Sequence, residues 1–232
     1  MRFRVDVTAP SGTLAWQDVL GPCRGWFYGL LAEQVPALGA ALHERGFGRA
    51  GMRPLGCSGP VFPRQRPSRG SFAVGGAGSI WLASPVQEIA ASLAAALVER
   101  SEVRWGETRW PVRGVALEPA PDFSAGVVEW TTTTPVVLKG GGRDNKFLLP
   151  DDTEYEARLA ANLRRKAEAL GLPAEAAVEV VKAGPRRLFR VDGSAWVGAT
   201  LVARVEAPPD TLSAVWSWGL GMGNIMGFGW VR

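Results

Sequence analysis

The sequence predicts an α+β fold made of two tandem ferredoxin-like units, each with the element order βαββαβ. Three observations support this prediction. Residues 2–7 alternate charged and apolar side chains, as a half-buried strand does. Ser84 and Thr153 each stand three residues before a Gln or a Glu, which is the spacing of a capping box at the start of a helix. Segments rich in Val, Thr and Gly flank both helices, in the same order in each half of the 232 residues.

The first unit is expected to span residues 1–120. In chain order we expect a strand over 2–7, a helical stretch interrupted at Pro36 and ended by Gly46, β segments near 55–62 and 71–82, a helix from Ser84 and a strand over 112–118. Val86, Ile89, Leu93 and Leu97 recur at helical spacing, so the helix after Ser84 should have one apolar face.

Pro119 and Pro121 mark the expected linker to a second unit over residues 121–232. In this unit we expect strands over 126–138, 178–182, 188–191 and 200–205, a helix from Thr153 that Gly171 and Pro173 end, and a short helix over 210–218. The last expected strand is Phe228–Arg232, directly after a run of glycines.

The composition limits the class of partner and the cellular compartment that we expect. The formal net charge of +4 favours a polyanionic partner, though weakly. Cys23 and Cys57 provide neither a disulfide framework nor a metal-ligand spacing, so we expect two buried free thiols. The first strand has no apolar signal core, and the most apolar helix, near 89–98, is shorter than the roughly 20 residues that cross a bilayer. We therefore expect a cytoplasmic protein.

The chain ends in the glycine-rich segment GLGMGNIMGFGWVR, residues 219–232. Such loops often hold phosphate, because backbone N–H groups can approach an anion where no Cβ stands in the way. A dinucleotide fingerprint is excluded, since it needs a helix and a further strand after the glycines, and no Gly-Lys-Ser/Thr closes a Walker loop. Two interpretations remain: a tight hairpin that serves backbone geometry, or a loop that holds a phosphate-bearing ligand.

Few side chains in this sequence suit catalysis. His43 is the single histidine and the carboxylates are scattered, so neither a His-rich site nor a two-metal nuclease is expected, and no metal or other cofactor is predicted. No Gly-x-Ser-x-Gly elbow is present. His43 stands at the end of a short helix, where a histidine either bonds the last carbonyls or takes part in proton transfer.

Four stretches form a pattern when they are taken together. They are Gly219-Leu-Gly221 with Gly227-Phe-Gly229; Thr134–Lys139; Pro150–Glu154 with Ala161–Lys166; and Tyr28, His43 and Arg49, with intervals of fifteen and six residues. This pattern, which spans almost the whole chain, resembles the CRISPR-associated endoribonucleases of the Cas-six group in the RAMP superfamily. Enzymes of that group cut precursor repeat RNA into guide units.

The resemblance implies an RRM-like RAMP fold and a metal-independent endoribonuclease. The substrate's own 2′-hydroxyl would be the nucleophile, and a 2′,3′-cyclic phosphate would remain on one product. His43 would transfer the proton, Tyr28 would orient His43 or share the proton transfer, and Arg49 would offset charge on the phosphate. Arg49 stands where lysine is common; arginine stays protonated, so it can hold charge but cannot relay a proton.

The resemblance also implies that the glycine-rich loop contacts RNA backbone, and two clusters of arginines are candidates for further contacts. The expected RNA-binding residues are Gly219, Gly221, Gly223, Asn224, Gly227, Gly229, Arg64, Arg66, Arg69, Arg186, Arg187 and Arg190. The expected partners are CRISPR repeat RNA, further effector subunits and a second copy of the chain. Two alternatives stay open: a non-catalytic RAMP subunit that binds guide RNA in a larger complex, and an RNA-binding protein outside CRISPR biology.

Overall fold

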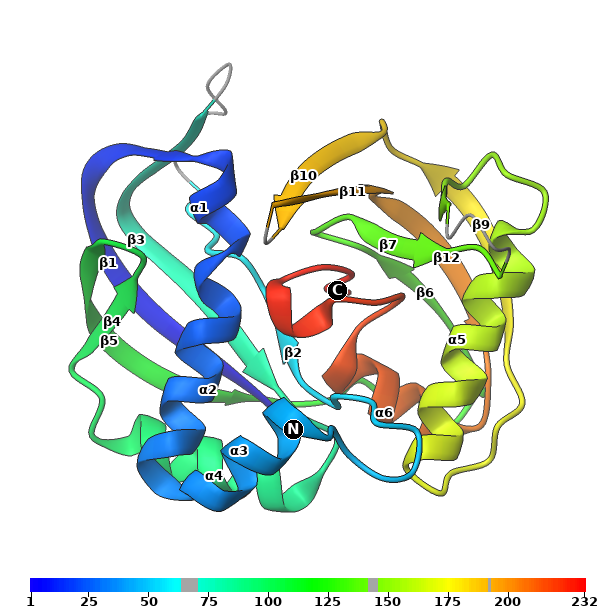
Figure 1. Cartoon of the computed structure of the whole chain (residues 1–232), viewed down its shortest axis with the longest axis horizontal. Coiled ribbons are helices and arrows are strands. Elements are labelled where there is room, and N and C mark those ends of the chain that lie inside the picture. The colour runs from blue at the N-terminus through cyan, green and yellow to red at the C-terminus, as the bar shows by residue number, and fades with distance from the viewer. Residues whose placement is uncertain (64–70, 142–145, 192) are drawn as a thin grey trace.

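The structure confirms the α+β class. It is a computed structural model that describes residues 1–63, 71–141, 146–191 and 193–232. Three antiparallel sheets and the helices that cover them form two halves that lie side by side (Figure 1). No helix among these described residues is long and apolar enough to cross a membrane.

The first half contains a five-stranded sheet with strand order β2-β3-β1-β5-β4. Its elements are β1 (Arg2–Ala15), α1 (Trp16–Leu20), α2 (Pro22–Gln34), α3 (Pro36–Glu44), β2 (Gly56–Cys57), β3 (Ser71–Ala83), α4 (Gln87–Val98), β4 (Glu102–Trp105) and β5 (Thr108–Glu118). β1 is more than twice as long as the strand predicted over 2–7, because a register shift between Ala9 and Gly12 lets it continue along β3 as far as the pair Ala15–Ser71.

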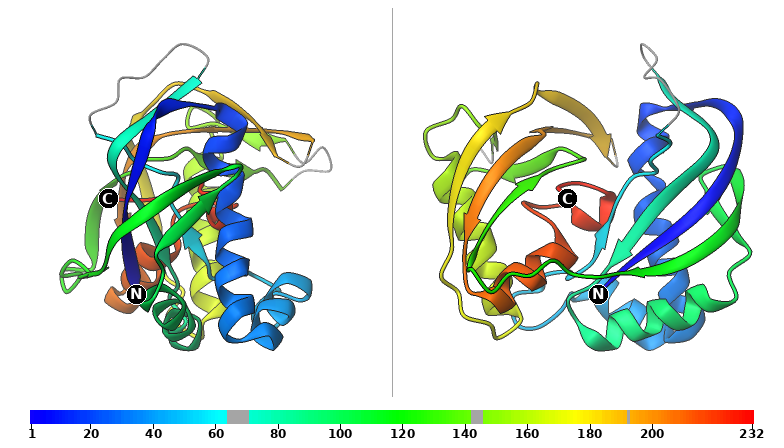
Figure 2. Two further views of the ribbon diagram at one scale, coloured as in Figure 1. Left: turned by 90° about the vertical axis from the view of Figure 1, so that its left-hand side faces the viewer. Right: turned by 180° about the vertical axis from the view of Figure 1, so that it is seen from behind.

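Helices α2 and α4 cover one face of this sheet (Figure 2). Phe27 and Leu30 of α2 and Leu93 of α4 are buried in the same core as Val5 of β1. α4 begins at Gln87 with Val86 at its N-cap and no side-chain cap, so the capping box predicted at Ser84 does not form. The Ser84 hydroxyl instead accepts a hydrogen bond from the Val86 amide at 3.1 Å in the turn before the helix. Both cysteines are free and buried, as the sequence predicts.

The second half contains two smaller sheets, with strand orders β10-β11-β7-β8 and β6-β12-β9. Its elements are β6 (Val127–Thr131), β7 (Val136–Lys139), β8 (Phe147–Leu148), α5 (Tyr155–Ala169), β9 (Ala177–Ala183), β10 (Arg187–Val191), β11 (Ser194–Ala199), β12 (Leu201–Glu206), α6 (Pro209–Trp218) and the 3₁₀-helix η1 (Asn224–Met226).

Two sequence predictions for the second half were wrong. The single strand expected over 126–138 is two strands, β6 and β7, in different sheets, and they are separated just before Val136 by Pro135, which has no N–H to give to a ladder. The last strand expected over Phe228–Arg232 is only a bridge between Val231 and Thr132, because the preceding glycines fold the chain back under β6 and β7.

Each half has its own buried core, and two features join them. The buried Arg2 guanidinium donates to the backbone oxygens of Trp216 at 2.7 Å and Val231 at 3.0 Å, and it lies over the Trp216 ring at 3.4 Å. Burial lowers the pKa of Arg2 to about 9, although Glu118 opposes the shift. At the other end of the chain, Phe228 and η1 pack into the core of the first half against α2 and β2. The division into two domains at residue 120 stays a prediction.

Candidate functional site

Tyr28 and His43 meet at the angle between α2 and α3. α2 ends where Val35 leaves the helical conformation, and Pro36 starts α3, so the chain turns back and residue 43 comes to lie beside residue 28. The two rings contact edge to face, with centroids 5.1 Å apart and an interplanar angle of 77°. Tyr28 is half-buried and His43 is exposed, so the imidazole is open to a large substrate. The structure thus brings together two of the three predicted catalytic residues.

The Tyr28 hydroxyl is the less accessible of the two groups. Its oxygen is buried and has no hydrogen-bond partner among the described residues. Burial raises the pKa of Tyr28, and the nearby guanidinium groups of Arg53 and Arg24 partly oppose this. The hydroxyl therefore keeps its proton at neutral pH and can donate it in a hydrogen bond to an incoming group.

The third predicted residue, Arg49, lies at the tip of a hairpin turn after α3. Phe47 and Met52 close this turn, with the Phe47 amide donating to the Met52 carbonyl at 2.6 Å. Arg49 is exposed, and no hydrogen bond joins it to Tyr28 or His43 in the described part of the chain. Arg53, at the end of the same turn, donates from Nη2 to the His43 carbonyl at 2.6 Å. Among the described residues, the structure therefore joins Arg53, and not Arg49, to the backbone of His43.

The glycine-rich loop is held from within by Lys166 and Asn224. The Lys166 ammonium is 2% exposed and donates to the Gly219 carbonyl at 2.6 Å and to Asn224 Oδ1 at 2.8 Å. The Asn224 amide nitrogen donates to the carbonyls of Leu220 and Phe228. Both ends of the Asn224 side chain are thus occupied inside the loop. This is a structural role for the side chain, and the RNA contact expected of Asn224 from the sequence stays a prediction.

The glycines give the loop its shape. Gly219, Gly221, Gly227 and Gly229 are buried, Gly223 is half-buried, and all five have positive φ. At Gly227, with φ of 90°, an added Cβ would lie 2.9 Å from Leu20 and 3.1 Å from the Cys23 sulfur. No side chain fits there without moving the first-half core, so the loop uses glycine for close packing and turning.

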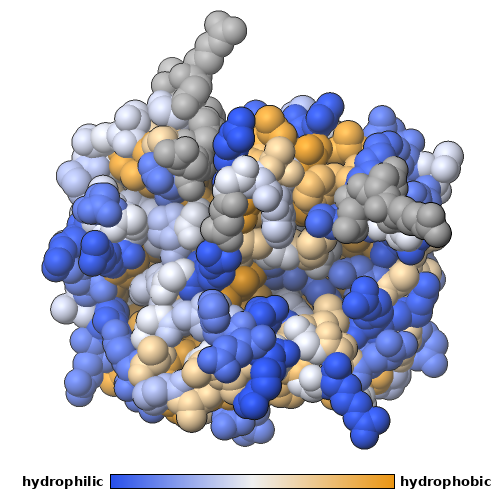
Figure 3. Space-filling view, in the orientation of Figure 1, coloured by the Kyte–Doolittle hydropathy of each residue, from blue (hydrophilic) through white to orange (hydrophobic). Residues whose placement is uncertain are grey.

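The predicted arginine clusters have different outcomes. Arg64, Arg66 and Arg69 lie outside the described residues. Arg186, Arg187 and Arg190 are exposed on and beside β10, which pairs with β11 and contacts α1 of the other half. A cavity of about 680 Å³ lies beside Arg186 and Arg187, and one of about 440 Å³ lies beside Arg190. Figure 3 shows this face of the molecule, with a hollow near its centre that hydrophilic side chains border.

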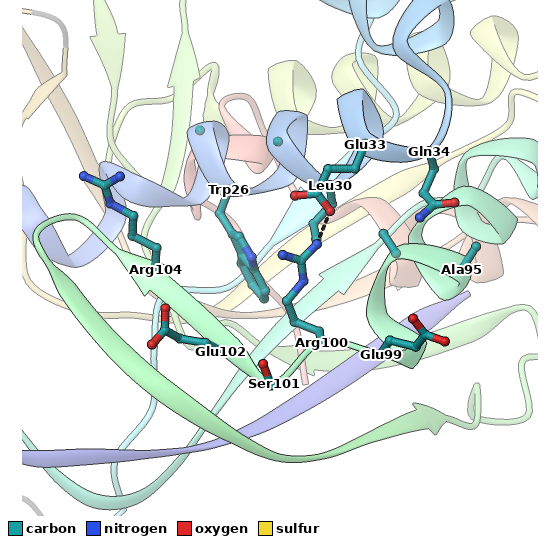
Figure 4. A pocket seen from close by; sticks show the side chains of 13 residues that line it. Trp26, Leu30, Glu33, Gln34, Ala95, Glu99, Arg100, Ser101, Glu102 and Arg104 are labelled. Atoms are coloured by element: carbon teal, nitrogen blue, oxygen red, sulfur yellow. Dashed lines mark hydrogen bonds and ion pairs between the residues drawn. The ribbon is translucent and has the colours of Figure 1, made fainter.

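Another cavity, of about 610 Å³, lies between α2, the end of α4 and β4 (Figure 4). Trp26 stands in it, and Arg100 forms an ion pair with Glu33. Its lining includes three glutamates and two arginines, so its charge does not favour a polyanion, and it contains none of the predicted site residues.

No three His, Cys, Asp or Glu side chains in the described ranges lie close enough together to hold a metal ion.

Residues 118–232 match the family model described as CRISPR associated protein Cas6, C-terminal. The chain belongs to the Cas6 family. The resemblance carried by the four sequence stretches is thereby confirmed. No curated protein matches the sequence.

Solved Cas6 structures share the fold over the whole chain. The product of a Cas6-related gene from Pyrococcus furiosus is 16% identical with a TM-score of 0.82, over 100% of this chain and 97% of that one. A RAMP protein described as binding different RNA substrates is 18% identical with a TM-score of 0.78, over 100% and 98%. A Cas6 product complex is 20% identical with a TM-score of 0.65, over 100% and 99%. These likenesses confirm the tandem ferredoxin-like fold of this Cas6 protein.

Sequence reasoning missed Arg53, which bonds the His43 carbonyl, and Lys166, which holds the glycine-rich loop. Lys166 could have been found from the sequence, because it interrupts the apolar stripe of α5, which has Leu159 and Leu163 on the same face. A lysine is rarely buried unless its ammonium has a partner, so its position in that stripe indicates a specific contact. Arg53 gives no comparable signal, since its position depends on how the turn after α3 closes.

Proposed function

We propose that this Cas6 protein is a metal-independent endoribonuclease that binds CRISPR repeat RNA and cuts precursor transcripts into guide units in the cytoplasm. The observation that supports the proposal best is the contact between Tyr28 and His43, beside the turn that carries Arg53. That turn and the glycine-rich loop line one cavity. An exposed imidazole paired with a tyrosine is a proton-transfer arrangement that needs no metal ion.

In the proposed reaction the 2′-hydroxyl of the RNA attacks the adjacent phosphorus, and the bond from phosphorus to the 5′-oxygen of the next nucleotide breaks. The products are a 2′,3′-cyclic phosphate and a 5′-hydroxyl. His43 moves a proton at the attacking or the leaving oxygen, and Tyr28 donates a hydrogen bond from its buried hydroxyl. Arg53, with Arg49 further along the same turn, offsets the charge that develops on the phosphate.

The RNA backbone would follow the positive surface of β10, where Arg186, Arg187 and Arg190 are exposed. It would reach the glycine-rich loop at Gly223, which is the half-buried glycine of the five, while the other four position the loop. Association with further CRISPR subunits or with a second copy of the chain stays a prediction.

The test is to incubate the purified chain with its host's own repeat RNA and with an unrelated hairpin. We expect tighter binding to the repeat and one cut in each repeat. Binding without cutting would contradict the enzyme and indicate a subunit that only holds guide RNA. Equal affinity for both RNAs would contradict a role in CRISPR processing.

A further inference from the structure

A cavity of about 240 Å³ lies between the turn after α3, helix α5 and the glycine-rich loop. Arg53 lines it from the turn, Asn162 and Lys166 from α5, Trp196 from β11 and Met222 from the loop. Both halves of the chain therefore build it. Arg53 also donates to the His43 carbonyl at 2.6 Å, so one side chain links the cavity to the helix that carries the candidate catalytic histidine.

The charge of the cavity is positive and uncompensated. Among the described residues, its lining includes Arg53 and Lys166 and no Asp or Glu. Lys166 is 2% exposed and, in the described part of the chain, has no carboxylate within 4.0 Å; its contacts are a carbonyl, an amide oxygen and the Trp218 ring at 5.0 Å. Buried ammonium groups are usually paired with an acid, since desolvating an unpaired charge is costly. An anion in the cavity would supply the missing negative charge.

Burial also lowers the pKa of Lys166 well below its ordinary value of 10.5. This direction agrees with an ammonium that lacks an anionic partner in the free protein.

A second polar group in the lining has no partner. Asn162 Oδ1 is buried and accepts no hydrogen bond from the described residues. A buried carbonyl-type oxygen without a donor is destabilising, and a ligand that carries a hydroxyl or an amine would satisfy it. The half-buried Trp196 ring adds an aromatic wall on the other side of the cavity. Phosphate, hydroxyl and aromatic base occur together in a ribonucleotide.

We propose that this cavity binds one ribonucleotide next to the cleaved bond, with its phosphate facing Arg53 and Lys166 and a ribose hydroxyl or base amine donating to Asn162 Oδ1. The assignment rests on the proposed function, because it places the nucleotide beside His43. It makes Arg53 and Asn162 substrate contacts that hold the RNA at the site.

The test uses free ribonucleoside 3′-monophosphates as probes, titrated into the full chain by calorimetry. Arg53→Gln and Asn162→Leu should each weaken binding roughly tenfold or more, the usual effect of losing a charged or buried hydrogen bond. Arg45→Gln is the matched control, since Arg45 is exposed on the neighbouring segment and does not line the cavity. Thermal unfolding checks that each variant folds, and either lining variant alone suffices for the measurement.

Three results would overturn the inference: no binding of the monophosphates to the wild-type chain, equal binding by both lining variants, or binding of inorganic phosphate as tight as that of the nucleotides. If the wild-type chain cleaves RNA but does not bind the monophosphates, the nucleotide pocket is contradicted and the proposed function stands. If the wild-type chain binds the monophosphates, both lining variants lose that binding, and the wild-type chain leaves repeat RNA intact, the nucleotide pocket is supported and the nuclease activity is contradicted.

Discussion

The His43 imidazole and the Tyr28 ring meet edge to face with their centroids 5.1 Å apart, although the two residues belong to different helices. The contact limits the positions that the exposed imidazole can take and leaves its outer side open to RNA. A histidine that merely bonded the last carbonyls of α3 would not need this partner, so the pair favours proton transfer.

We expect His43→Ala to lower the single-turnover rate of RNA cleavage by roughly 10²–10⁴-fold, the usual effect of removing a positioned proton-transfer group. RNA affinity should change little, because phosphate contacts dominate it. Glu44→Gln, at the next exposed position of the same helix, is the control and should cut at the wild-type rate. A His43→Ala chain that cuts equally fast would show that the residue has no catalytic role.

The resemblance to the family pointed to this pair, and the two rings meet in the structure because the interval from Tyr28 to His43 is short and Pro36 starts a new helix between them. The sequence predicted the C-terminal segment less well. Phe228 looks like part of an edge strand, yet it packs into the first-half core, and only a contact across the two halves decides that. Arg53 was missed for a different reason: its hydrogen bond to the His43 carbonyl lies within the first half and exists only once the turn after α3 has closed.

The glycine-rich loop should tolerate no side chain at Gly227. Valine there would need a φ of 90° and would press on Leu20 and Cys23, so Gly227→Val should lower the free energy of unfolding by roughly 2–5 kcal/mol. Urea unfolding measures this. Gly25→Ala is the control, since its Cβ would meet nothing within 4 Å in the interior of α2, and it should raise stability by about 0.5–1 kcal/mol. Equal stability of Gly227→Val and wild type would mean that the loop packs differently.

Lys166 should make stability depend on pH in a defined direction. Its folded-state pKa lies well below the unfolded value of 10.5, so between those two values the unfolded chain binds more protons than the folded one. The cost of the buried charge is fully present below the folded pKa and disappears as the pH rises toward 10.5. The stability of wild type relative to Lys166→Met should therefore increase from neutral pH upward. A difference that stays constant or falls over that range would contradict a buried, unpaired ammonium.

RNA affinity should fall steeply with salt if the β10 arginines contact phosphate. Each contact to a single strand contributes about −0.7 to the slope of log K against log salt, so Arg187→Gln should make the slope shallower by about that amount. Filter binding over a series of salt concentrations measures it. Arg113→Gln, exposed on β5 of the other half, should keep the wild-type slope. A salt-independent affinity would show that the cluster is only a solvated surface.

The chemical step itself can be separated from binding by altering one nucleotide. If the substrate's 2′-hydroxyl is the nucleophile, an RNA with a 2′-deoxy sugar only on the 5′ side of the cut keeps every phosphate and loses the attacking group. It should bind nearly as tightly as the unmodified RNA and remain uncut, since phosphates dominate affinity. Because the proposed mechanism uses no metal ion, cleavage of the natural RNA should continue in excess EDTA. It should leave a 2′,3′-cyclic phosphate and a 5′-hydroxyl, which mass spectrometry identifies. Cutting of the deoxy RNA, or activity that EDTA abolishes and magnesium restores, would eliminate this mechanism and leave the contact between Tyr28 and His43 without a chemical role.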